Sequence, residues 1–141
     1  MKKKLKFEVF AISLFIVACL FVFFVYMGYL DEIQIKNVVN NYFSTLSEGR
    51  YELAKNYCVP DGEFCKFADF VKNQHEEIGP FYNPIIVPHI IGCYTGMSNN
   101  FVEVELVITA SALGTNLRQM DKIFMFLAKE KSGLLGAWKL K

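Results

Sequence analysis

Twenty-two consecutive residues, Val9–Leu30, include no charged side chain. As an α-helix, a run of this length extends about 33 Å, close to the thickness of the hydrocarbon layer of a bilayer. The alternative is a buried core helix, but a small domain rarely buries a helix that is apolar on every side. The sequence therefore predicts one membrane-spanning helix over residues 9–30.

Charge on the two sides of this run predicts its orientation. Four lysines precede it, at positions 2, 3, 4 and 6, and Asp31 and Glu32 follow it directly. Lys and Arg concentrate on the cytoplasmic side of membrane spans. We therefore expect a cytoplasmic tail at residues 1–8 and an extracytoplasmic domain at residues 31–141 of a single-pass cell-membrane protein.

The apolar run could also be a processed signal. It is longer than the apolar region of most cleaved signal peptides, and no small-x-small site ends it. Ile16–Cys19 resembles a bacterial lipobox, in which the cysteine is acylated, but Leu20–Leu30 continue apolar where a lipoprotein has a polar tether. The sequence favours an uncleaved signal anchor, with a lipoprotein processed at Cys19 and a secreted form as the alternatives.

The outer segment, residues 31–141, has 11 of the 15 Lys and Arg and 13 of the 14 Asp and Glu, a formal net charge of −2. Without a basic stripe, nucleic-acid binding is not expected. Its cysteines are Cys58, Cys65 and Cys93. Cys58 and Cys65 flank a Pro-Asp-Gly turn, so they could form a disulfide outside the cytoplasm, or all three could be buried thiols. Their spacing fits no zinc motif, and no metal or other cofactor is expected.

Helical periodicity dominates the first half of this segment. Apolar residues between Ile35 and Leu46 follow i, i+3, i+4 spacing, which predicts a helix of about 16 residues that ends at residues 47–49. Shorter helices are predicted over residues 50–58 and 63–75, the latter with Phe64, Phe67, Ala68 and Val71 as its buried stripe.

Strand patterns dominate the second half. We predict strands over residues 85–94, 101–112, 122–131 and 137–141, with turns at 96–100 and 132–133 and a loop at 114–119. Pro88 indicates an edge strand or a bulge in the first strand. Trp138 and Leu140 should point inward from the last one. Helices followed by consecutive strands predict an α+β domain with helices on one face of an antiparallel sheet.

One passage carries a resemblance to a known superfamily. Residues Tyr42–Ala54 read Tyr-Phe-x-x-Leu-x-x-Gly-x-Tyr-x-x-Ala, and the chain closes on a Trp-Lys-Leu strand. With three predicted helices and a curved sheet, residues 31–141 resemble the nuclear-transport-factor-2-like (cystatin-like) superfamily. The resemblance implies a cone-like domain of about three helices packed on a curved antiparallel sheet, with a pocket between the two layers.

Enzymes of that superfamily place a base and a hydrogen-bond donor in the pocket. The weak candidates here are Asp69 and His89 as bases, with Tyr57 and Tyr94 as donors. No catalytic motif links them, and Asp69 is expected on a solvated helix face. His89 alternates with the apolar Val87 and Ile91, which favours an inward-facing histidine in the core or at the pocket rim over a catalytic base. No catalytic residue is therefore assigned.

Aromatic residues fall into three clusters, and core packing is the default interpretation of each. Phe70 and the Phe81–Tyr82 pair are harder to place inside. We expect them to line a ligand pocket or a partner surface, together with Tyr57 and Tyr94. The clusters are Phe64, Phe67 and Phe70; Phe81 and Tyr82; Phe124 and Phe126.

The leading functional hypothesis is a non-enzymatic, membrane-anchored bacterial domain that binds a ligand or a protein. Its partners would be the lipid bilayer, through residues 9–30, and either other envelope proteins or a second copy of the chain. The layout resembles the inner-membrane scaffold components of type IV secretion and conjugation machines. The alternatives are a small-molecule isomerase or dehydratase that uses His89 or Asp69, and a pilin-like subunit.

Overall fold

The computed structural model describes residues 2–79, 83–95, 100–112, 115–130 and 136–141, and divides into two compact units, Met1–Ile33 and Gln34–Lys141. The first helix, α1 (Lys2–Ser47), contributes to both units. In the first unit its described side chains are mostly exposed, and its most apolar window has a mean hydropathy of 2.7. By length and composition, α1 is the one helix among the described residues that could cross a membrane.

In the second unit, α1 has the predicted amphipathic face. Apolar side chains spaced three and four residues apart are buried, from Ile35 to Leu46. The helix ends as predicted, because Gly49 adopts a φ of +72° that only glycine reaches without strain. The amide of Gly49 donates to the carbonyl of Leu46, and that of Arg50 donates to Thr45, so this end forms a Schellman motif.

Two shorter helical segments follow. The predicted 50–58 helix is present as α2 (Tyr51–Ala54) continued by a 3-10 turn, η1 (Lys55–Tyr57). Helix α3 (Glu63–Ile78) is about one turn longer than predicted. Its buried residues are Cys65, Ala68 and Val71, whereas Phe67 is exposed, so the predicted stripe was wrong at that position. Cys65, Ala68 and Val71 are spaced three residues apart, so they share one face of the helix, and Phe67 lies outside that face.

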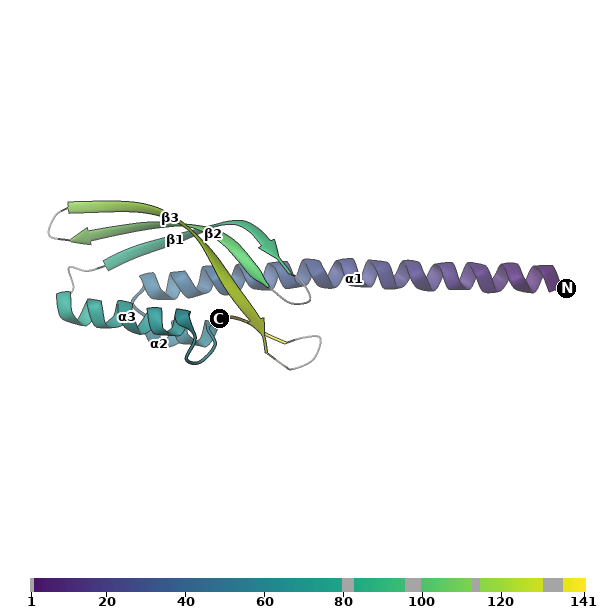
Figure 1. Cartoon of the computed structure of the whole chain (residues 1–141), viewed down its shortest axis with the longest axis horizontal. Helices are drawn as coiled ribbons and strands as arrows, with labels where there is room; N and C mark the ends of the chain where they lie inside the picture. Colours follow the sequence, from purple (N-terminus) through teal and green to yellow (C-terminus); the bar gives the residue numbers. More distant parts are fainter. Residues whose placement is uncertain (1, 80–82, 96–99, 113–114, 131–135) are drawn as a thin grey trace. The chain divides into compact units, whose positions relative to one another are not determined.

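Four antiparallel strands form one sheet in the order β1-β2-β3-β4 (Figure 1). Their bounds are β1 (Asn83–Tyr94), β2 (Phe101–Ala112), β3 (Thr115–Lys129) and β4 (Trp138–Leu140). The loop predicted at residues 114–119 was wrong from Thr115 onward, because β2 and β3 pair without interruption up to Ala112 and Thr115. Backbone hydrogen bonds between β2 and β3 decide the structure of this segment, although its polar composition is typical of a loop. The predicted turn at 132–133, and all of the predicted turn at 96–100 except Asn100, lie outside the described residues.

The prediction from Pro88 is confirmed, since β1 is an edge strand and carries a bulge between Ile90 and Gly92. The amide of Ile86 donates to the Ser47 hydroxyl at 2.9 Å, so the backbone of Ile86 faces the open edge. Hydrogen-bonding direction alternates along a strand, so the backbone of Pro88, two residues further on, faces the same open edge. The missing N–H of Pro88 therefore removes no bond to β2. This edge is therefore poorly suited to adding another strand.

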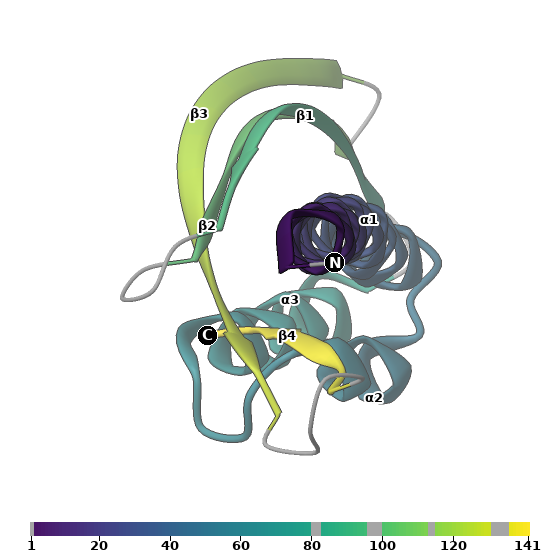
Figure 2. The ribbon, with the colours of Figure 1, turned by 90° about the vertical axis from the view of Figure 1, so that its right-hand side faces the viewer.

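The sheet curls over the Gln34–Ser47 part of α1 (Figure 2), and the core fills the space between them. Val102, Val104 and Leu106 of β2 are buried there and define the inner face of the sheet. Trp138 and Leu140 are also buried, which confirms the predicted docking of the last strand. The domain is thus α+β, with helices on one face of a curled antiparallel sheet, an arrangement compatible with the expected cone.

Candidate functional site

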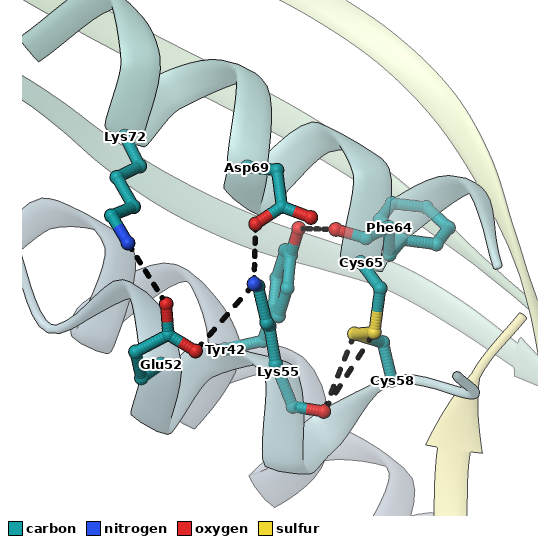
Figure 3. Close-up of polar contacts among 8 residues, drawn as sticks. All are labelled: Tyr42, Glu52, Lys55, Cys58, Phe64, Cys65, Asp69 and Lys72. Carbon is teal, nitrogen blue, oxygen red and sulfur yellow. Dashed lines mark hydrogen bonds and ion pairs between the residues drawn. A yellow bond between two sulfur atoms is a disulfide. The ribbon is translucent and has the colours of Figure 1, made fainter. Parts of the chain in front are cut away.

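Asp69, one of the two candidate bases, belongs to a chain of ion pairs between helices. Its carboxylate forms an ion pair with the ammonium group of Lys55 (Figure 3). The Lys55 nitrogen also lies 3.5 Å from a carboxylate oxygen of Glu52. Glu52 in turn accepts a 3.1 Å hydrogen bond from Lys72. The hydrogen bond to Asp69 raises the pKa of Lys55, and the bond from Lys72 lowers the pKa of Glu52. These four exposed or half-exposed groups connect α2 and η1 to α3, so Asp69 takes part in a contact between helices.

Beside this network, a buried disulfide and a partly buried hydrogen bond hold α3 against the rest of the domain. Cys58 and Cys65 form a disulfide between the residue after η1 and the first turn of α3, with their Cα atoms 5.7 Å apart (Figure 3). The Tyr42 hydroxyl of α1 donates a 2.6 Å hydrogen bond to the carbonyl oxygen of Phe64. Burial raises the pKa of Tyr42 well above its usual value, so this phenol remains a protonated donor.

His89, the other candidate base, is exposed on the opposite side of the sheet from the helices. The expectation of an inward-facing His89 was therefore wrong. Its apolar neighbours Val87 and Ile91 are exposed as well, and the inward positions of β1 are Ile86, partly buried Pro88 and Ile90. The alternation along β1 correctly divides its side chains between the two faces of the sheet. It does not reveal which face is the core, because both sets of side chains are largely apolar.

The candidate catalytic groups are not brought together. Asp69 lies on the helical layer, and His89 lies on the outer face of the sheet, the face turned away from the helices. Tyr57 lines a separate groove of about 410 Å³ with Asn37, Asn56 and Trp138, while Tyr94 is on the outer face. No His, Asp or Glu is among the residues that line this groove. The space between the layers is filled by Tyr42, Phe43 and Met125, among other buried side chains.

Four aromatic rings gather at one end of the outer face, and we call them the aromatic patch: Tyr94, Phe101, Phe124 and Phe126. Phe101 is central, with Tyr94 stacked on it at a 4.8 Å ring separation and the other two rings at 5.9 and 6.1 Å. Tyr94, Phe124 and Phe126 are 47%, 59% and 51% exposed. Core packing was therefore the wrong interpretation of Phe124 and Phe126. Lys122 lies on the same side of β3 as both rings, because side chains two residues apart on a strand share a face. A charged residue on that side could have placed both rings outside the core.

Two further cross-strand rows cover the outer face next to this patch. His89, Glu105 and Lys122 are in register across β1, β2 and β3, and we call them the charge row. Beyond it, Val87, Val107 and Met120 form an apolar row, in which Val87 and Met120 are exposed and Val107 is buried. A charged row between aromatic and aliphatic ones is an unusual composition for a sheet face that only contacts water.

A second exposed aromatic pair lies on α3. Phe67 and Phe70 stack at a ring separation of 6.4 Å, and Phe70 is 53% exposed. Exposure of Phe70 agrees with the difficulty of placing it in the core. Phe81 and Tyr82, the other predicted binding residues, lie outside the described residues. Within the described part of the chain, no group of three or more His, Cys, Asp or Glu side chains could hold a metal ion.

Comparisons with known proteins assign no relative: no protein family, no curated protein and no solved structure matches this chain. The exposed outer face of the sheet is therefore the candidate site on its geometry alone.

Proposed function

We propose that this chain is a membrane-anchored binding protein whose domain, residues 31–141, lies outside the cytoplasm and binds a partner through the outer face of its sheet. The observation that carries the proposal is the aromatic patch. Soluble domains rarely leave several large aromatic rings half exposed in one cluster without a binding role. The nuclear-transport-factor-2-like resemblance is part of the proposal, with the difference that binding uses the outer face in place of an inner pocket.

Binding is favoured over catalysis by the separation of the candidate groups. Acid–base chemistry needs a base and a group that stabilises developing charge within reach of one substrate. Asp69 is ion-paired on the helical layer, and His89 is on the far side of the sheet. An envelope complex, as in secretion or conjugation machines, offers the kind of protein partner that an aromatic surface fits.

The extracytoplasmic location is supported by the lysines before the apolar run and by the disulfide, because disulfides persist mainly outside the cytoplasm. A labelling experiment tests it, with Cys19 and Cys93 replaced by Ser. Lys66→Cys, whose parent side chain is 65% exposed, should react with a membrane-impermeant maleimide in intact cells. Lys3→Cys should react only after the membrane is opened. The opposite pattern would reverse the proposed topology.

The binding role is tested by complementing a strain that lacks this chain. Phe124→Ala and Phe126→Ala should each weaken partner association by about 1–2 kcal/mol, as aromatic anchors do, with little loss of stability. Phe70→Ala is the matched control, because its ring is similarly exposed but lies on α3. Asp69→Asn should retain activity, because Asp69 is ion-paired on the helical layer, away from the outer face. If Asp69→Asn abolishes activity while the protein accumulates folded, the binding proposal fails and catalysis replaces it.

A further inference from the structure

The part of the outer face formed by β2 and β3 has a pairing pattern that points to a specific partner. Three of its cross-strand pairs are an aromatic pair, a pair of opposite charges and an aliphatic pair. The members of each pair share a face and lie side by side on neighbouring strands. They are Phe101 and Phe126, Glu105 and Lys122, and Val107 and Met120.

These pairs make the surface complementary to itself under one simple rotation. A two-fold axis parallel to the strands and midway between β2 and β3 would set β2 of one copy against β3 of another. Glu105 would then oppose Lys122 of the second copy and Phe101 would oppose Phe126. Glu103 would oppose Phe124, and the buried Val107 would lie across from the exposed Met120. The four charges would alternate in sign around the axis. A two-fold axis centred on β2 alone would instead oppose Glu105 to itself.

We propose that the partner of the outer face is a second copy of this chain, bound β2 against β3 around the Glu105–Lys122 pair. This inference rests on the proposed binding role of the outer face and names its partner. The sheet curls over α1 (Figure 2), so its outer face is convex, and two convex faces meet along a strip rather than over whole sheets.

The exposed area of the strip predicts a weak complex. Phe124 and Phe126 are 59% and 51% exposed and Met120 is 56% exposed. At roughly 100 Å² for each half-exposed large side chain, these three offer about 300 Å² per copy, below the about 800 Å² of a standard interface. Anchoring two copies in one membrane compensates for the small contact area, because it raises the local concentration of the two domains.

The direction of the axis also allows two copies to share a membrane. Ser47, at the end of α1, bonds to Ile86 near the start of β1, and the Gln34–Ser47 part of α1 runs in the general direction of β1 and β2 (Figure 1). Rotation about an axis parallel to the strands therefore leaves both Gln34 residues at the same end of the dimer. A two-fold axis across the strands would send them to opposite ends.

Charge exchange tests this geometry in the full chain. Energy transfer between donor- and acceptor-labelled chains is measured in phosphatidylcholine liposomes, with labels at Lys66→Cys and with Cys19 and Cys93 replaced by Ser. Glu105→Lys gives four positive charges around the axis and Lys122→Glu gives four negative ones, so each should weaken self-association at least about tenfold. The double variant Glu105→Lys/Lys122→Glu restores the alternation and should recover association. Thermal melting of each variant checks that the fold is intact.

Mixing the two single variants gives the sharpest outcome. Donor-labelled Glu105→Lys and acceptor-labelled Lys122→Glu should associate with each other although neither associates with itself. Equal energy transfer in the wild type and both single variants, or a double variant no better than the single ones, would overturn the dimer. If self-association is absent while Phe124→Ala still abolishes activity in cells, the inference fails and the proposed binding function stands with a different partner.

Discussion

The Cys58–Cys65 disulfide closes a short loop, with a sequence separation of 7. A crosslink of that span should remove about 8 cal/mol/K of chain entropy from the unfolded state, which corresponds to about 2.4 kcal/mol at 25 °C. Cys58 and Cys65 are 1% and 8% exposed, and reduced thiols would pack in the same places as small apolar groups. Reduction should therefore cost the domain most of this energy without disturbing its core.

Urea unfolding of the full chain in a mild detergent measures the effect. Trp138 is the single tryptophan of the chain and is buried, so its fluorescence reports unfolding of the domain. With m-values of about 1–3 kcal/mol/M for small domains, reduction should lower the urea midpoint by about 1–2 M.

Two variants control this experiment. Cys58→Ala/Cys65→Ala should unfold at the same urea concentration with and without reductant, and Cys93→Ser should respond to reductant as the wild type does. A thiol count must confirm that the bridge has opened. If the fully reduced protein keeps the midpoint of the oxidised protein, the loop is held by packing alone, and the entropic reasoning is refuted.

Other predictions follow from individual contacts. Trp138→Ala should lower the free energy of unfolding by about 3–5 kcal/mol, measured by the same urea titration; a melting temperature within a degree or two of wild type would show that β4 is not docked. Tyr42→Phe leaves the Phe64 carbonyl without its donor and should cost about 1–2 kcal/mol, whereas the exposed Phe70→Ala should cost far less. Burial raises the pKa of Tyr42 in the folded state, so its contribution is intact below about pH 10 and is lost as the pH rises further. Tyr42→Phe should therefore lose stability less steeply than wild type above about pH 10 in a pH series of urea midpoints.

Local patterns in the sequence were sufficient where one periodicity or one special residue decides the structure. The amphipathic stripe from Ile35 to Leu46 and the left-handed Gly49 define the end of α1. Pro88 indicated an edge or bulge because only such positions tolerate a missing N–H. The alternation of Val102 and Val104 with Glu103 and Glu105 correctly oriented β2, since one of its faces is charged.

The outer face of β1 could not be predicted in the same way, because both faces of this strand are apolar. Ile86 is buried and Val87 is exposed, although the two residues are chemically alike. Their orientation depends on the register with β2, and that register shifts at the bulge between Ile90 and Gly92. The aromatic patch exists only after three strands pair, so no single stretch of sequence contains it.

In-cell photocrosslinking tests the outer face as a binding surface most directly. A benzoylphenylalanine side chain would replace Phe124 in one variant and Phe70 in another, two phenylalanines that are 59% and 53% exposed on different layers of the domain. If the outer face is the binding surface, position 124 should give a discrete crosslinked product in native membranes and position 70 should give none. A product from position 70 alone, or none from position 124 in cells where the protein is active, would contradict it.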